Sequence, residues 1–261
     1  MANPMYRQIA EDLRAQIDSG GLQPGQQLRT ELELRDHYGA SRNTVRDAIK
    51  WLTTLGLVET RPGQGTFVVK KIHPFVTTLT ADLRDNTYKV VTAPGEGELY
   101  GREVAAQRRV PSSTDPQVEI QKASGTIAAQ LQVPEGTPVI SRHQKRSIDG
   151  TPWSMQTSFY PRTFASQGAE RLSDADDIEG GAVRYLTETL GLRQVGYRDW
   201  ITVRAPDPIE ASFFNVPQDG RIGVFEIFRT AFDQSGAPMR VTVTVFPTDR
   251  NQFQVNVGDV P

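Results

Sequence analysis

The chain has 261 residues, which is enough for two domains of ordinary size. Its 29 Lys and Arg residues nearly balance 31 Asp and Glu residues, so the net charge of −2 alone argues against a nucleic-acid partner, and the absence of cysteine excludes disulfides, thiolate catalysis and cysteine-ligated metals. No apolar run reaches the roughly 18 residues of a membrane span, and MANPMYRQIAEDLR lacks the apolar stretch of a signal peptide. We therefore expect a cytoplasmic protein without a membrane partner.

The first 40 residues predict two helices. The first ends at Ser19-Gly20-Gly21, and its apolar stripe consists of Tyr6, Ile9, Leu13 and Ile17. The second is ELELRDHY, for which Thr30 and Glu33 form a capping box and Gly39 supplies a left-handed stop.

A third helix follows directly, capped by Ser41. Its expected buried side consists of Val45, Ile49, Leu52 and Leu55. Two helices joined by a short turn containing glycine are typical of a helix-turn-helix motif. The alternating segments LVET and TFVV, joined by RPGQG, then predict a short hairpin, the wing of a winged helix-turn-helix.

The outward face of the third helix is rich in basic and amide groups: Arg42, Asn43, Arg46 and Lys50. Between Arg42 and Lys71 six basic residues face two acidic ones, a local charge of +4. Arg suits guanine and Asn suits adenine in the major groove, while Ser41 and Thr44 suit phosphate. Gln64 and Gly65 at the wing tip suit close approach to the minor groove. A solvated helix face is the alternative, but the capped helix before it and the wing after it favour DNA.

Residues 71–98 predict a connector, with a short helix at 81–85 and a turn-rich end. Beyond it the pattern is mostly β, and the expected strands are REVAAQRRV, PVISRHQKRSI, WSMQTSFY, IGVFEIFRTAF and MRVTVTVF. The acidic run 174–177 is expected to be a solvated loop before a helix containing VRYLTETL, and not a metal site.

The second half contains an internal repeat. Residues 127–152 align with residues 209–238 as a helix, a Val-Pro turn, a long strand, a hairpin turn and the next strand. The offset grows from 83 to 86, so small insertions separate the two copies. Such a duplication is expected where two similar halves share one sheet.

Residues 4–69 resemble the winged helix-turn-helix of the GntR family of bacterial repressors. By position, the resemblance implies base or phosphate contacts for Arg42, Asn43, Thr44 and Arg46, and wing-tip contacts for Gln64 and Gly65. The family's L-P-S-E-R reads here Leu28-Arg29-Thr30-Glu31-Leu32, so Leu32 replaces a common phosphate-contacting Arg and Arg29 is the candidate substitute. Asn43 also stands where Thr is more usual, which could change the operator sequence.

Residues 99–261, with the ending TVFPTDRNQF, resemble the UTRA effector domain of the HutC subgroup, whose fold is that of chorismate lyase. The resemblance implies an α+β protein in which a mixed or antiparallel sheet with flanking helices binds a small molecule and forms the homodimer. The implied effector-binding residues are Arg142, Gln144, Arg146, Gln156, Ser158, Arg229, Arg240 and Thr242.

Three of these positions depart from the family's pattern. The R-x-R pair that holds an anion reads Gln144-Lys145-Arg146, and Lys145 cannot replace the lost guanidinium because it faces the other side of the strand. Family glutamates correspond to Gln156 and Arg240. The alternative interpretation of Arg142, Arg146 and Arg229 is that they are exposed or paired across strands, and Phe159 and Tyr160 are expected to be core residues.

No carboxylate pair, nucleophile elbow or phosphate-binding glycine loop is present, and the three histidines lie far apart in the sequence, so we expect no enzyme, no cofactor and no metal. The sequence predicts a dimeric repressor that binds an inverted repeat in double-stranded DNA and responds to a small-molecule effector. One alternative is an effector-independent DNA-binding protein whose second domain only dimerises, which the missing arginine favours. A small-molecule enzyme fused to a DNA-binding domain is the third possibility.

Overall fold

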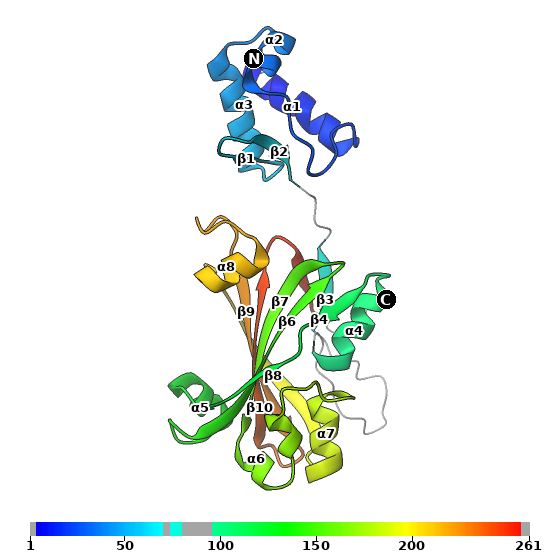
Figure 1. Cartoon of the computed structure of the whole chain (residues 1–261), viewed down its shortest axis with the longest axis vertical. Helices are drawn as coiled ribbons and strands as arrows, with labels where there is room; N and C mark the ends of the chain where they lie inside the picture. Colours follow the sequence, from blue (N-terminus) through cyan, green and yellow to red (C-terminus); the bar gives the residue numbers. More distant parts are fainter. Residues whose placement is uncertain (1–3, 70–73, 80–95, 257–261) are drawn as a thin grey trace. The chain divides into compact units, whose positions relative to one another are not determined.

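The computed structural model describes residues 4–69, 74–79 and 96–256, and the chain divides into two compact units, Met1–His73 and Pro74–Pro261 (Figure 1). The first unit contains α1 (Met5–Asp18), α2 (Glu31–Tyr38), α3 (Arg42–Thr54), β1 (Val58–Arg61) and β2 (Gly65–Val68). No helix among the described residues is long and apolar enough to cross a bilayer.

The three helices of the first unit pack around one apolar core, whose largest fully buried members include Ile9, Leu34 and Leu52. The predicted capping box is confirmed: Thr30 accepts from the backbone amide of Glu33 and the Glu33 side chain accepts from that of Thr30. Gly39 adopts φ 60°, a conformation that favours glycine and so ends α2 before the turn. The expected burial of Leu55 is wrong, because Leu55 lies after the last turn of α3 and is 43% exposed.

The second unit is built on a seven-stranded antiparallel sheet, ordered β4-β6-β7-β10-β9-β8, with β5 also pairing with β6. Its strands are β4 (Pro111–Ser113), β5 (Gln117–Lys122), β6 (Pro138–Ile148), β7 (Thr151–Pro161), β8 (Gln194–Arg204), β9 (Val224–Asp233) and β10 (Pro238–Pro247). The helices of this unit are α4 (Gly97–Ala106), α5 (Gly125–Leu131), α6 (Thr163–Ser166), the 3-10 helix η1 (Glu170–Ser173), α7 (Gly181–Leu190) and α8 (Pro208–Phe214).

The internal repeat is confirmed as α5-β6-β7 and α8-β9-β10. Both repeat helices lie on one face of the sheet, where α5 packs near Val139 and Val241 and α8 packs near Met155 and Val245. Figure 1 shows α4 and α7 on the opposite side, which is the face that carries the candidate effector site.

Two segments differ from the sequence prediction. The strand expected at 102–110 is wrong, because residues up to Ala106 continue α4, in which Tyr100 and Val104 are buried one helical turn apart. Within the expected connector 71–98, residues 75–78 form β3 (Phe75–Thr78), which pairs in parallel with β11 (Asn251–Gln254). The helix expected at 81–85 lies outside the described residues.

Candidate functional site

The outward face of α3 is formed by the residues that the sequence selected for DNA contact. Arg42, Asn43, Arg46 and Lys50 are all exposed, because Val45, Ala48 and Ile49 turn the opposite side of the helix into the core. Ser41 caps the helix by accepting from the amide of Thr44 at 3.2 Å. The helix therefore presents cations and an amide together with a capped N-terminus, the end that suits phosphate.

Glu31 is a member of this surface that sequence reasoning missed. Its carboxylate oxygens lie 3.2 Å from Arg42 Nε and 3.0 Å from Arg46 Nε. The hydrogen bond from Arg46 is the main reason that the pKa of Glu31 lies below its usual value. Both guanidinium groups are therefore oriented by one carboxylate from α2, while the replacement residue Leu32 is 57% exposed and Arg29 is exposed just before α2.

The wing tip is contacted by the side chain of Gln27. Its Nε2 donates to the backbone oxygen of Gln64 at 2.8 Å, and the same nitrogen lies 2.3 Å from where a Cβ would stand at Gly65. Gly65 also has φ 120°, which strains any other residue. Gly65 thus allows the close approach, and Gln64 remains exposed at the tip.

In the second unit, the candidate effector residues share one face of the sheet because the strands pair in register. One row across the strands reads Arg142, Ser158, Thr242, Arg229 and Asp199. Ser158 and Thr242 are buried and joined by their hydroxyls at 3.2 Å, and Gln156 donates to Ser158 at 3.3 Å. The face is therefore polar and buried at once.

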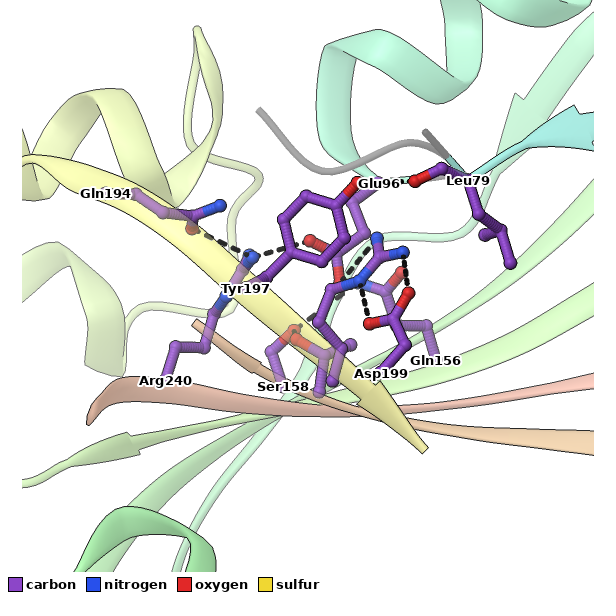
Figure 2. Close-up of polar contacts among 10 residues, drawn as sticks. Leu79, Glu96, Gln156, Ser158, Gln194, Tyr197, Asp199 and Arg240 are labelled. Carbon is purple, nitrogen blue, oxygen red and sulfur yellow. Dashed lines mark hydrogen bonds and ion pairs between the residues drawn. The ribbon is translucent and has the colours of Figure 1, made fainter. Parts of the chain in front are cut away.

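Two arginines meet a carboxylate from outside the sheet (Figure 2). Arg240 Nη2 lies 2.5 Å from Glu96 Oε2, and Arg229 Nη1 lies 3.9 Å from Glu96 Oε1. Asp199 accepts from Arg229 through two bonds of 2.7 Å, and Gln194 accepts from Arg240 at 3.3 Å. The exposed fraction of the Glu96, Arg229 and Arg240 side chains is 6%, 5% and 5%, so these charges are almost fully removed from water.

Arg146 completes a cluster of three guanidinium groups. It is buried against the ring of Tyr100 in α4, with Cζ 4.8 Å from the ring centroid. Burial alone raises the pKa of Glu96, but the charges of Arg240, Arg229 and Arg146 outweigh burial and hold that pKa below its usual value. Glu96 is therefore an ionised buried carboxylate. We call Arg146, Arg229 and Arg240 the arginine cluster.

Arg142 and Gln144 are engaged elsewhere. The Arg142 guanidinium donates to the backbone oxygens of Arg171, Leu172, Asp174 and Asp176 at 2.7 to 3.3 Å. It thus anchors the chain around η1 and the acidic run. Gln144 donates to the backbone oxygen of Thr114 at 3.2 Å. By the alternative interpretation, Arg142, Arg146 and Arg229 are exposed or paired across strands. Exposure is wrong, since all three are buried, but Arg229 is paired across strands with Asp199.

The aromatic residues next to this face belong to the core. Tyr160 is buried among Ile140, Leu172 and Leu186, while Phe159 packs on the opposite face of the sheet near α5. Sequence reasoning missed Glu96, Gln194, Tyr197 and Asp199. Only Asp199 had a usable signal, since it stands opposite Arg229 once β8 and β9 are paired.

A small pocket opens beside the cluster between β3, β9 and β10. Thr77, Leu79, Glu96, Ile227, Arg229, Thr244, Phe246 and Phe253 line it. It has room for roughly one water molecule. Leu79, one of the lining residues, accepts a hydrogen bond from the Tyr197 hydroxyl through its backbone oxygen at 2.7 Å. Of the arginine cluster, only Arg229 lines this pocket, together with Glu96.

Comparison with known proteins agrees with both halves of the chain. The model of the bacterial regulatory proteins of the gntR family matches residues 5–68, and the UTRA domain model matches residues 106–252. The HTH-type transcriptional regulator RB1450 of Rhizobium meliloti, which is described as uncharacterized, is 28% identical over 256 residues, covering 98% of this chain and 96% of that protein. The repressor NagR of Bacillus subtilis is 46% identical over 67 residues, 26% of this chain and 28% of NagR.

Solved structures share the fold. PhnF from Mycobacterium smegmatis superposes with a TM-score of 0.56 at 21% identity, covering 97% of this chain and all of PhnF (100%). Its separately solved effector domain superposes with a TM-score of 0.52 at 20% identity, covering 61% of this chain and 94% of that domain. The relatives are transcriptional regulators rather than enzymes, which agrees with the absence of a catalytic motif from the sequence. The protein belongs to the GntR family of DNA-binding transcriptional regulators, in the HutC subgroup that joins a GntR head to a UTRA effector-binding domain.

Proposed function

We propose that the protein is a cytoplasmic, dimeric transcriptional repressor whose affinity for DNA falls when a small anion binds to the arginine cluster of the UTRA domain. In this proposal residues 1–70 bind DNA and residues 99–261 bind the effector and dimerise. The segment 71–98 contributes β3 and Glu96 to the second domain. The observation that carries the proposal is the burial of three guanidinium groups around one carboxylate, since buried cations of this kind suit anion binding.

For DNA, we propose that α3 enters the major groove with Arg42, Asn43 and Arg46 toward the bases and Lys50 toward phosphate. Ser41, Thr44, Arg29, Gln64 and Gly65 would contact the backbone or the minor groove. Two copies then require half-sites centred about 10 bp apart, or a multiple of that, on one face of the duplex. Selection of bound sequences from random DNA with the purified chain tests this: an inverted repeat with that spacing supports the proposal, and a single asymmetric site contradicts it.

For the dimer, we propose that a second copy covers the edge strand β8. This strand has a hydrogen-bonded neighbour only at β9 among the described residues, and Trp200 and Val203 on it are 59% and 63% exposed. A long apolar edge left open promotes uncontrolled association. Trp200→Glu should shift the chain from dimer to monomer in sedimentation velocity. Ile120→Glu on β5, also an exposed apolar residue at 53%, is the matched control and should stay dimeric.

A specific observation favours the second candidate, an effector-independent regulator. Glu96 already neutralises part of the cluster, and the R-x-R position Gln144 donates to a backbone oxygen instead. Thermal unfolding of the full chain across a panel of small phosphates and carboxylic acids separates the two candidates, because a ligand that binds the folded state raises the midpoint. Stabilisation that Arg240→Gln abolishes supports an effector, and no stabilisation across the panel supports the effector-independent candidate.

A further inference from the structure

Glu96 differs from the other charged groups of the effector face in where it comes from. The three arginines and Asp199 stand on the sheet, whereas Glu96 lies immediately before α4, 144 residues away from Arg240 in the sequence. It is the N-cap residue of α4, yet its side chain makes no capping hydrogen bond. Capping is the usual role of an acidic side chain at that position. The carboxylate is instead directed at the arginine cluster.

The contacts of this carboxylate leave the hydrogen-bonding capacity of the site unfilled. Oε2 meets Arg240, but Oε1 has no hydrogen-bond partner among the described residues. The same holds, within the described ranges, for Arg240 Nε and Gln156 Oε1, both buried. Buried polar atoms without partners are costly, and a permanent structural ion pair is normally satisfied more completely. Arg240 Nε is therefore a buried donor open to an acceptor such as an oxyanion oxygen, while the Glu96 and Gln156 oxygens are open acceptors.

The charged contacts of the cluster also indicate that Glu96 can be replaced. Three guanidinium groups, those of Arg146, Arg229 and Arg240, act on the Glu96 carboxylate, and Asp199 pairs with Arg229. Asp199 is fixed to Arg229 by two short hydrogen bonds from its own strand pair. Glu96 has one short contact and a long one of 3.9 Å. Of the two carboxylates, Glu96 has fewer hydrogen bonds to the arginines among the described residues, one from Arg240 against two from Arg229 to Asp199.

From these observations we infer that the Glu96 carboxylate is a built-in competitor of the effector: it occupies the arginine cluster in the free protein and a small oxyanion binds by displacing it. The inference rests on the proposed function, because it concerns the same site. Its consequence is that Glu96 sets the effector concentration at which the protein responds. It also links the site to α4, since the displaced residue is the one from which that helix begins.

Inorganic phosphate is a suitable probe, with chloride at matched ionic strength as the reference. Thermal midpoints of the full chain are measured against phosphate concentration for the wild type, Glu96→Gln and Glu119→Gln. The last makes the same charge change at an exposed position on β5. Glu96→Gln should bind phosphate about tenfold more tightly than the wild type, because the competing charge is gone. Glu119→Gln should match the wild type.

If the wild type and Glu96→Gln bind phosphate with equal affinity, the inference is overturned. If Arg240→Gln also abolishes that binding in both, the anion site of the proposed function stays intact. Phosphate binding that is absent from both, or indifferent to Arg240→Gln, overturns the anion site itself. Should Glu96→Gln fail to fold, Glu96→Asp decides: it keeps the charge but withdraws it by one methylene, so phosphate should bind more tightly than to the wild type, and unchanged affinity counts against competition.

Discussion

Glu31 restrains the two arginines that are expected to read DNA, and removing its charge should be measurable. Its oxygens lie 3.2 Å from Arg42 Nε and 3.0 Å from Arg46 Nε, and the exposed fractions of the three side chains are 35%, 69% and 56%. Exposed pairs of this kind contribute about 0 to 1 kcal/mol each, so Glu31→Gln should cost the domain little stability. The same small energy opposes the transfer of both guanidinium groups to DNA, and the carboxylate also repels phosphate. We therefore expect Glu31→Gln to bind random-sequence duplex about two- to fivefold more tightly.

Fluorescence anisotropy of a labelled random duplex, titrated at several salt concentrations, measures this change. The gain should shrink as salt rises, because exposed charges are screened within about 10 Å at 0.1 M. Asp36→Asn is the matched control: it removes the same charge from α2, but Asp36 pairs with Arg35 at 2.8 Å and not with α3. Weaker DNA binding by Glu31→Gln would refute the reasoning and make Glu31 a positioning residue for the arginines. An equal gain in affinity in Asp36→Asn would show that the change in net charge alone causes the effect.

Three further predictions concern Arg46, Gly65 and Glu96. Arg46→Ala should weaken binding to the selected operator by about 1–3 kcal/mol beyond its effect on random DNA, as measured by competition titration, because a base contact is lost together with a charge. Gly65→Ala should lower the thermal midpoint of the first unit and its DNA affinity, because φ is 120° and the new Cβ meets Gln27. The double variant Gly65→Ala, Gln27→Ala should recover only the part of this loss that the clash with Gln27 causes. The folded pKa of Glu96 lies below its ordinary value of 4.5. The stabilisation of the fold by the ionised Glu96 is therefore complete above pH 4.5 and is lost as pH falls through the folded pKa. Urea unfolding should show this loss of stability at acid pH in the wild type and less of it in Glu96→Gln.

The first unit was predictable from sequence because its signals are local. A cap such as Thr30 with Glu33, a stop such as Gly39 and an apolar stripe in α3 each act within a few residues, and together they define the helices and the outward face. Local signals could not predict that Glu31 pairs with both Arg42 and Arg46, because these contacts depend on how α2 packs against α3.

The second unit was predictable in its repeat but not in its charges. Alternation identified the long strands β6, β7, β9 and β10 but not β8, and the duplicated helix-strand-strand pattern identified the two halves. Glu96 carries no such signal: it lies in a glycine-rich segment without periodicity, and its partners are on β9 and β10. The segment 102–110 was misassigned because it alternates weakly, as a strand does. Tyr100 and Val104 also lie at helical spacing, and the helix forms because both residues are buried when α4 packs on the sheet.

The departures from the family's pattern have a common physical consequence. The site lacks a guanidinium at Gln144 on β6 but has one at Arg240 on β10, where the resemblance implies a carboxylate, and a carboxylate arrives instead at Glu96. Positive charge has thus moved across the sheet toward β9 and β10, next to Leu79 at the end of β3. Arg229 of this cluster lines the same pocket as Thr77 and Leu79, and β3 is the first strand after the DNA-binding unit in the chain.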